Sequence, residues 1–192
     1  ADNGGHIKES DKDIRVCGFE FDDYGKLINL VKSLDEKVLL MVSSVDGAFS
    51  ENTDPDVKKW ITDSYGMELK HIEDLSSLTA KVTKVAVYFY DISAKEGAAL
   101  IRPGVGEGIN VFSSGGHWVD IVPAGVDKKS AAEYMMQLLE VTPEETLVFG
   151  DNLNDLSMMS CTPNSYAAPD AMPEVKSAAA HQLTGDLKYA VS

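Results

Sequence analysis

One short string of the sequence combines residue types suited to phosphate chemistry. Residues 150–155 read GDNLND and carry two carboxylates and an amide on what looks like a loop. Carboxylate oxygens are the hard ligands that Mg²⁺ prefers, so Asp151 and Asp155 are candidate metal ligands. The amide of Asn154 can donate a hydrogen bond to a phosphoryl oxygen without adding charge. The string therefore predicts a place where a cation and a phosphate meet.

A second candidate is Lys128, in the string GVDKK at residues 125–129. A lysine in the first turn of a helix opposes the helix dipole, which favours anions there. An ammonium group and a helix N-terminus together form a good seat for phosphate. Both strings also have purely structural interpretations. Paired lysines are typical of a solvated helix face, Asp, Asn and Gly are typical of turns, and Asp155 is a suitable helix cap.

The elements around these strings alternate between helix and short apolar strand. Asp127 can cap a helix from Lys128 to about Glu140. The pattern then predicts a strand over 146–149, a helix over 153–160, a strand over 165–168 and a helix from Met172. This alternation indicates a parallel α/β sheet. Ligands bind beyond the carboxyl ends of such strands, which is where GDNLND falls.

Residues 11–122 follow a different pattern and predict an α+β unit. Its sheet is expected to be antiparallel, with helices on one face. The strands are expected at 14–21, 38–42 and 82–90, with a hairpin of 109–113 and 118–122, and the helices at 24–34, 55–65 and 93–101. Asp54 and Pro55 are typical of a helix start, and Gly66 of a helix end.

Charge and composition exclude several classes of protein. The chain has 31 acidic residues against 17 Lys and Arg, a formal net charge of −14. We expect neither nucleic-acid binding nor docking on an anionic membrane, because both depend on clustered Lys and Arg. Two well-separated cysteines, Cys17 and Cys161, without metal-ligand spacing favour free thiols in a reducing cytoplasm. We therefore expect a cytoplasmic protein.

The strings GVDKK and GDNLNDLSM resemble the Cof-type branch of the haloacid-dehalogenase superfamily, subfamily IIB. The opening DNGGHI resembles a stretch that precedes the cap domain in that family. The resemblance implies an α/β fold, with a Rossmann-like parallel-sheet core of which this chain holds the C-terminal half. It implies a core remnant over 1–10, a type-IIB α+β cap that sets substrate specificity over 11–122, and the core half over 123–192.

The resemblance also implies roles for individual residues. Asp151 would be a Mg²⁺ ligand and Asp155 would support the metal site. Lys128 and Asn154 would contact the phosphoryl group, so that Lys128, Asp151 and Asp155 form the catalytic set. An Asn-Ala pair of the family appears here as Asp170-Ala171, which leaves a contact from this position open. The implied activity is Mg²⁺-dependent hydrolysis of small phosphorylated metabolites, such as sugar phosphates, through an aspartyl-phosphate.

One departure from the family concerns the nucleophile. The family uses the first Asp of an Asp-x-Asp-Gly-Thr motif, and no Asp-x-Asp-Gly string occurs in these 192 residues. We expect the chain to be a fragment of a longer phosphatase, inactive by itself, whose fold a missing N-terminal core segment completes. Two alternatives stay open: a phosphosugar mutase of the same superfamily, revealed by a bisphosphate requirement, and a truncated module that binds without turnover.

Overall fold

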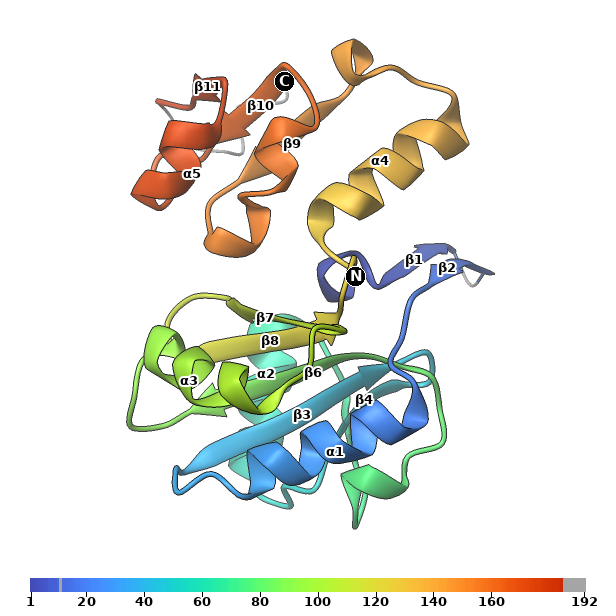
Figure 1. Cartoon of the computed structure of the whole chain (residues 1–192), viewed down its shortest axis with the longest axis vertical. Helices are drawn as coiled ribbons and strands as arrows, with labels where there is room; N and C mark the ends of the chain where they lie inside the picture. Colours follow the sequence, from blue (N-terminus) through green and yellow to red (C-terminus); the bar gives the residue numbers. More distant parts are fainter. Residues whose placement is uncertain (11, 185–192) are drawn as a thin grey trace. The chain divides into compact units, whose positions relative to one another are not determined.

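The computed structural model describes residues 1–10 and 12–184, which form two compact units, residues 1–124 and 125–192 (Figure 1). Residue 11, where the α+β region was expected to begin, and the last eight residues of the expected core half lie outside the described residues. Among the described residues, no helix has both the length and the apolar character needed to cross a membrane.

The first unit is built on a six-stranded sheet in the order β5-β4-β3-β6-β8-β7. All neighbouring strands are antiparallel except β4 and β5, which are parallel. The strands are β3 (Val38–Ser44), β4 (Gly47–Ser50), β5 (Leu69–His71), β6 (Val82–Phe89), β7 (Ile109–Ser113) and β8 (Trp118–Pro123). The predicted hairpin of β7 and β8 is confirmed, while the short strands β4 and β5 carried no clear periodicity and were not predicted.

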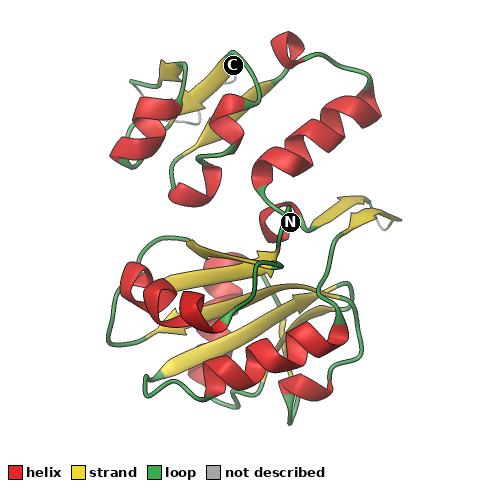
Figure 2. Ribbon diagram, in the orientation of Figure 1, coloured by secondary structure: helices red, strands yellow, loops and turns green. Residues whose placement is uncertain are grey.

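Helices cover both faces of this sheet, so the prediction of helices on one face was wrong (Figure 2). Helices α1 (Phe21–Lys32) and α3 (Ala94–Ile101) pack on the face that contains Val85 and Val87 of β6. Helix α2 (Pro55–Tyr65) packs on the opposite face through Ile61, against residues that include Ala86. Successive residues of a strand point to opposite faces, and β6 is apolar on both.

Helix α2 has the ends that the sequence predicts. The Asp54 side chain accepts a hydrogen bond from the Asp56 amide, at 2.9 Å, and Pro55 occupies the first helical position. Gly66 ends the helix with φ +64°, a left-handed conformation that glycine adopts without strain. These caps fix the length of α2 and thereby the placement of Ile61 over the sheet.

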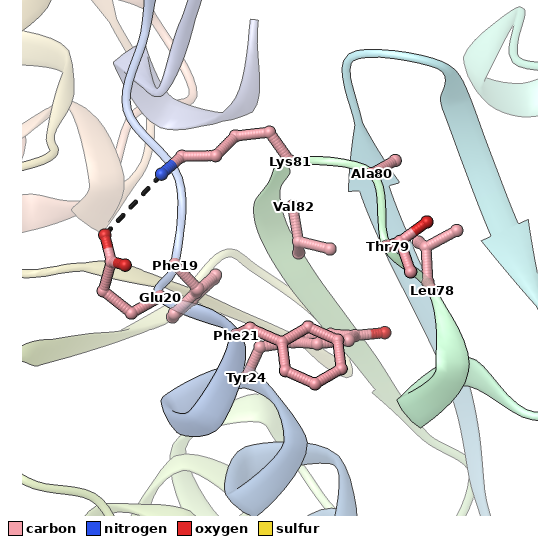
Figure 3. A pocket seen from close by; sticks show the side chains of 9 residues that line it. All are labelled: Phe19, Glu20, Phe21, Tyr24, Leu78, Thr79, Ala80, Lys81 and Val82. Atoms are coloured by element: carbon pink, nitrogen blue, oxygen red, sulfur yellow. Dashed lines mark ion pairs between the residues drawn. The ribbon is translucent and has the colours of Figure 1, made fainter.

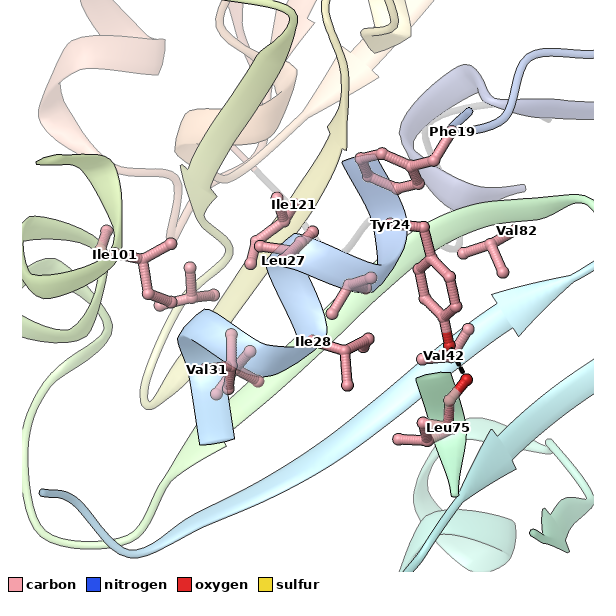
Figure 4. Close-up of a cluster of buried hydrophobic side chains, with 14 of the residues drawn as sticks. Phe19, Tyr24, Leu27, Ile28, Val31, Val42, Leu75, Val82, Ile101 and Ile121 are labelled. Carbon is pink, nitrogen blue, oxygen red and sulfur yellow. Dashed lines mark hydrogen bonds between the residues drawn. The ribbon is translucent and has the colours of Figure 1, made fainter. Parts of the chain in front are cut away.

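The main core of the first unit lies between α1, α3 and the sheet (Figure 4). Tyr24 is 1% exposed, and its hydroxyl donates a 2.6 Å hydrogen bond to the carbonyl oxygen of Leu75. Leu75 belongs to a short 3₁₀ turn, Leu75–Ser77, in the long connection between β5 and β6. This bond therefore ties that connection to α1 and satisfies a polar group within an apolar core.

The predicted strand over 14–21 was wrong in its second half. Strand β2 (Lys12–Val16) ends earlier and pairs with β1 (His6–Glu9), a strand that was not predicted. Phe21 instead begins α1, where Asp22 and Asp23 in the first turn favour a helix start. The apolar alternation past Val16 reflects the single buried side chain of Phe19 rather than a continued strand.

Residues 1–10 pack with the first unit. The Asn3 amide donates a 3.0 Å hydrogen bond to Asp120 of β8, and the Thr83 hydroxyl of β6 donates a 2.6 Å bond to Asp2. Asn3 and Asp120 are both buried, so these bonds satisfy polar groups away from water. The assignment of this segment to a catalytic core stays a prediction.

A pocket of about 220 Å³ lies beside the start of α1 in the same unit (Figure 3). Glu20 and Lys81, two of its lining residues, form an ion pair of 3.7 Å. The remaining lining is largely apolar and includes Phe19, Phe21 and Leu78. None of the residues that the sequence singles out for phosphate chemistry lines this pocket, so we assign it no part in that chemistry.

The second unit contains a parallel sheet of three described strands in the order β11-β10-β9. These are β9 (Leu147–Gly150), β10 (Asn164–Ala167) and β11 (His181–Gln182), and the helices are α4 (Lys128–Leu139) and α5 (Pro173–Ala178). The core comprises Met136 of α4, Val148 of β9, Met159, Cys161 and Val175 of α5, among others. The predicted parallel strands and the helices expected from Lys128 and near Met172 are confirmed.

The helix predicted over 153–160 is instead two separate 3₁₀ turns, Leu153–Asp155 and Met158–Ser160. The side chains of Asn152 and Asp155 both accept hydrogen bonds from backbone amides at the start of this segment. Such local side-chain bonds compete with regular helix and favour short capped turns. The consequence is a tight loop that keeps Asp151 and Asp155 close to the end of β9.

Candidate active site

The candidate site lies at the carboxyl edge of the three-stranded sheet, entirely within the second unit. Gly150 ends β9 and Ala167 ends β10, and the two residues are register partners. Asp151 follows the first strand directly, and Asp170 lies in the loop that follows the second. Parallel strands bring these two loops to the same edge, where ligands of open α/β sheets bind.

Helix α4 places Lys128 at this edge. Asp127 caps the helix, accepting a 2.7 Å hydrogen bond from the Ser130 amide, while the Ser130 hydroxyl accepts one from the Asp127 amide at 3.2 Å. This reciprocal capping fixes the first turn, in which Lys128 is the first helical residue. The Lys128 ammonium forms an ion pair with one carboxylate oxygen of Asp155. Lys128 and Asp155 are 27 positions apart in the sequence, and this contact joins the two strings that contain them.

Asp155 is the buried centre of this arrangement, with 3% of its surface exposed. Its second carboxylate oxygen accepts hydrogen bonds from the amides of Asp151, at 3.0 Å, and Asn152, at 3.1 Å. Burial by itself would raise the pKa of Asp155, but Lys128 and these two amides outweigh it and hold the pKa below its usual value. Asp155 is thus an anion that fixes both the loop and the lysine.

Gly150 is required by the packing of Asp155. A Cβ atom at position 150 would lie 2.6 Å from the Cβ atom of Asp155 and 2.7 Å from the terminal methyl group of Met159. Both distances are shorter than carbon atoms tolerate without a shift of one of them. The glycine therefore lets the loop fold back on the end of β9 and bring Asp155 underneath it.

Asp151 differs from Asp155 in exposure and in charge balance. Its residue surface is exposed, and the pKa of its carboxyl group is raised. Partial burial is the largest cause, the neighbouring carboxylate of Asp155 comes next, and Asp170 adds to the shift, while Lys128 opposes it. Asp151 is thus a solvent-accessible carboxylate in surplus negative charge, which a cation would relieve.

This donor set fits a hydrated Mg²⁺ ion better than a metal held wholly by protein. Mg²⁺ keeps several of its waters and is typically bound by one or two carboxylates. No group of three or more His, Cys, Asp and Glu side chains within residues 1–10 and 12–184 is arranged to hold a metal ion. Asp151 is the accessible carboxylate, while both oxygens of Asp155 already accept hydrogen bonds from protein groups. That Asp155 itself binds metal stays a prediction.

Asn154 lies on the 3₁₀ turn Leu153–Asp155 and is partly buried. Its proposed contact with a phosphoryl oxygen also stays a prediction. Sequence reasoning missed the role of Asn152, whose side chain caps this turn through a 2.8 Å bond from the Leu153 amide. The spacing of Asn152 and Asp155 is that of a capping box, which was the available signal.

Known proteins resemble the chain over most of its length. It is 21% identical to 5-amino-6-(5-phospho-D-ribitylamino)uracil phosphatase YbjI of Escherichia coli K12, over 95% of this chain and 67% of that protein. Kanosamine-6-phosphate phosphatase of Bacillus subtilis is 31% identical over 71 residues, 37% of this chain and 24% of that protein. A crystal structure from Eubacterium rectale superposes with a TM-score of 0.77 at 26% identity, over 94% of this chain and 69% of that one.

The chain thus spans about two thirds of the length of the YbjI phosphatase and of the Eubacterium rectale protein. The model of one protein family, described as haloacid dehalogenase-like hydrolase, matches residues 1–191. A match of that extent covers both compact units and the whole of the candidate site, so the chain belongs to the haloacid dehalogenase-like hydrolase family.

Proposed function

We propose that this chain forms part of a Mg²⁺-dependent phosphatase that hydrolyses small phosphorylated metabolites of the sugar-phosphate type. One observation carries the proposal: Lys128 and Asp155 are joined at the carboxyl edge of a parallel sheet, where they leave the carboxylate of Asp151 accessible. The relatives are named as phosphatases of a phosphorylated ribitylamino-uracil and of kanosamine 6-phosphate, which supports this substrate class.

The proposed roles follow from the contacts of each side chain. Lys128 has three N–H donors and, within the described part of the chain, uses one on Asp155, so two can serve phosphoryl oxygens. Asn154 contributes a neutral donor, and Asp155 positions Lys128 and the Asp151 loop. Asp151 would hold the Mg²⁺ ion, which when bound supplies positive charge that stabilises the charge developing on the transferring phosphoryl group.

In the proposed reaction a carboxylate oxygen attacks phosphorus, and the bond from phosphorus to the ester oxygen breaks. The leaving alkoxide takes up a proton and departs as an alcohol. Water then hydrolyses the aspartyl-phosphate, which releases inorganic phosphate and regenerates the carboxylate. Neither Asp155, which is buried and paired, nor Asp151, which we assign to the cation, is proposed as the nucleophile.

The first unit is proposed to act as the cap of this phosphatase. It is a separate compact α+β unit, and none of the residues assigned to phosphate chemistry belongs to it. Closure of such a domain over a reacting phosphate excludes bulk water and adds contacts to the leaving group. Which metabolite is bound would then depend on residues of the first unit.

The test measures release of inorganic phosphate from p-nitrophenyl phosphate and a panel of sugar phosphates, with and without Mg²⁺. It uses the protein as its gene encodes it, in unsubstituted and substituted forms. Mg²⁺-dependent release of phosphate by the unsubstituted protein, abolished by Asp151→Asn and by Lys128→Met, supports the proposal. If the unsubstituted protein binds these esters but never releases phosphate, it is a binding module instead. Interconversion of sugar phosphates with a bisphosphate requirement would show a mutase.

A further inference from the structure

A second pocket of the first unit has a volume of about 390 Å³, within the range of sites that bind small molecules. Strand β1 contributes His6 and Lys8 to its lining, the turn between β3 and β4 contributes Val45, β4 contributes Gly47 and β5 contributes Lys70. Two groups of this lining, the His6 imidazole and the Lys70 ammonium, are held in place by the protein while part of their hydrogen-bonding capacity stays open.

The His6 side chain is 6% exposed, and its ring is fixed from one side. Its Nε2 atom lies 2.7 Å from a carboxylate oxygen of Asp13, on the neighbouring strand β2. This hydrogen bond lowers the pKa of Asp13, so the Asp13 carboxylate is the acceptor and Nε2 is the donor. The same carboxylate oxygen lies 3.7 Å from the Lys8 ammonium. Asp13 therefore sets the orientation of the imidazole ring.

The other ring nitrogen of His6, Nδ1, has no hydrogen-bond partner within residues 1–10 and 12–184. In the same residues, no side-chain nitrogen or oxygen that is closed off from solvent lacks a partner. Nδ1 is therefore open to solvent although its side chain is more than nine-tenths buried, and the open space that His6 lines is this pocket. A polar atom of a buried side chain that opens into a cavity is suited to contact a ligand.

Lys70 is held by neutral groups rather than by a carboxylate. Its ammonium donates a 2.7 Å hydrogen bond to the carbonyl oxygen of Asp46 and lies 5.6 Å from the centre of the Phe49 ring. Gly47 makes room for this side chain, since a Cβ atom there would lie 3.3 Å from the ammonium nitrogen. No ion pair engages Lys70 in the described part of the chain, so two of its three N–H donors can serve an anion.

The charge of the lining favours an anion once His6 is protonated. The charged side chains of the lining are two of each sign: Lys8, Lys70, Asp2 and Glu68. They sum to +2 − 2 = 0, and a protonated His6 brings the sum to +1. A proton on Nδ1 leaves the bond from Nε2 to Asp13 intact and turns Nδ1 into a second donor.

We infer that this pocket binds the carboxylate or phosphate group of a small organic molecule, held by the Lys70 ammonium and by the Nδ1–H of protonated His6. A metal ion is the less suitable ligand, because the described residues contain no group of three or more His, Cys, Asp and Glu side chains arranged to hold one. The apolar part of the lining, Val45, Ala48 and Met67, can pack against the carbon skeleton of such a molecule. The inference does not rest on the proposed function, because every residue that it uses belongs to the first unit.

The ¹⁵N chemical shifts of the imidazole rings report directly on Nδ1 of His6. The protein as its gene encodes it is labelled with ¹⁵N-histidine and titrated separately with inorganic phosphate and with propionate, at constant ionic strength. The variant His6→Gln assigns the His6 signals. We expect a saturable shift of Nδ1 from a neutral acceptor toward a protonated donor, and the probe that binds more tightly shows which group the pocket takes.

His117 is the internal control of this titration. It belongs to the same unit, and its Nδ1 atom already lies 2.7 Å from the carbonyl oxygen of Ile92. Its signals should therefore not change when either probe is added. If neither probe shifts Nδ1 of His6 more than Nδ1 of His117, the inference is wrong.

The variant Lys70→Met tests the second contact. We expect it to weaken binding of the preferred probe at least about threefold, the effect of one partly exposed charge. Lys95→Met, an equal charge change on α3, should leave the affinity unchanged. Unchanged His117 signals in Lys70→Met would show that the fold is retained. Binding by Lys70→Met that is as tight as binding by the unsubstituted protein would overturn the inference.

The variant Lys128→Met separates this inference from the proposed function. It removes the proposed phosphate contact of the second unit and should leave the His6 titration unchanged. If the His6 shift is lost in Lys128→Met, the shift reports on the candidate active site, and the inference is wrong. If the His6 shift persists while the candidate-site variants do not affect phosphate release, only the proposed function is wrong.

Discussion

The side chain of Asp155 occupies the space in which a side chain on Gly150 would stand. A Cβ atom at position 150 would lie 2.6 Å from the Cβ atom of Asp155 and 3.1 Å from its carboxyl carbon. The buried carboxylate in turn holds Lys128 and the amides of Asp151 and Asn152. A single glycine therefore determines whether the two strings of candidate residues can meet.

Replacing Gly150 with alanine should displace Asp155 and loosen the loop. We expect a loss of about 2 kcal/mol in the stability of the second unit, the cost typical of overpacking a tight site. Hydrogen exchange of the Asp151 and Asn152 amides, followed by NMR, should speed up. Gly106→Ala is the control, since a Cβ atom there would meet nothing within 4 Å. Unchanged protection of both amides in Gly150→Ala would show that the loop adapts.

Removing the Lys128 ammonium should make the second unit more sensitive to acid. The pKa of Asp155 is lowered in the folded state, so its pairing contributes stability that is complete above the ordinary Asp pKa of 3.8 and is lost as the pH falls through the lowered pKa. In Lys128→Met, the ammonium that lowers the pKa of Asp155 is absent and only the two backbone amides counteract the effect of burial, so this pKa rises. Acid unfolding should then begin at a higher pH.

Circular dichroism between about pH 2 and pH 7 measures this shift. At neutral pH we expect Lys128→Met to cost about 3 kcal/mol, because it leaves a buried charge without its partner. Lys129→Met is the matched control. Lys129 pairs with Glu133 only at 3.8 Å, and both side chains are substantially exposed. Equal acid profiles for the two variants would contradict the assigned role of the Lys128–Asp155 pair.

The positions of Lys128 and of the loop after Gly150 could be predicted from the sequence, because helix caps and strand ends depend on local residue patterns. The caps at Asp127 and the short apolar strand before Gly150 indicate where a helix begins and a strand ends. Parallel topology then brings both ends to one edge. The direct contact of Lys128 with Asp155 could not be predicted, because it depends on how tightly the loop folds back, which the packing around Gly150 decides.

Other features depend on tertiary contacts that leave little trace in a single sequence. Strand β5 is three residues long and pairs with β4 across a connection of 18 residues that includes α2, so no periodicity marks it. Helix α2 covers the face of β3 and β6 that α1 and α3 leave uncovered. Both faces of β6 are apolar, so the alternation of its residues does not predict which face each helix covers.

Two glycines in helices of the first unit should respond in opposite ways to the same substitution. Gly25 lies within α1, where a Cβ atom would meet nothing within 4 Å, whereas a Cβ atom on Gly97 of α3 would overlap the ring of Phe89. Gly25→Ala should stabilise the unit by about 0.5–1 kcal/mol through helix propensity. Gly97→Ala should destabilise it by about 2 kcal/mol through overpacking.

Urea unfolding followed by tryptophan fluorescence measures both, because the two tryptophans of the chain, Trp60 and Trp118, lie in the first unit. Each variant is the other's matched control. Destabilisation by Gly25→Ala, or tolerance of Gly97→Ala, would contradict the packing described for α1 and α3 against the sheet.

The surplus charge that suits Asp151 to a cation should cost stability when no cation is bound. Its pKa is raised in the folded state, so above the ordinary Asp pKa of 3.8 the folded chain becomes less stable as that carboxyl group ionises. Asp151→Asn should therefore raise the metal-free melting temperature of the second unit by about 2–4 °C, after discounting for solvent screening. It should also abolish any rise in melting temperature that added Mg²⁺ causes in the unchanged chain.

Glu144→Gln, which removes a charge at the other end of β9, is the control. It should change neither the metal-free melting temperature nor the effect of Mg²⁺ on it. A lower metal-free melting temperature in Asp151→Asn would mean that this carboxylate holds the loop together, and its assignment as the cation ligand would lose its physical basis.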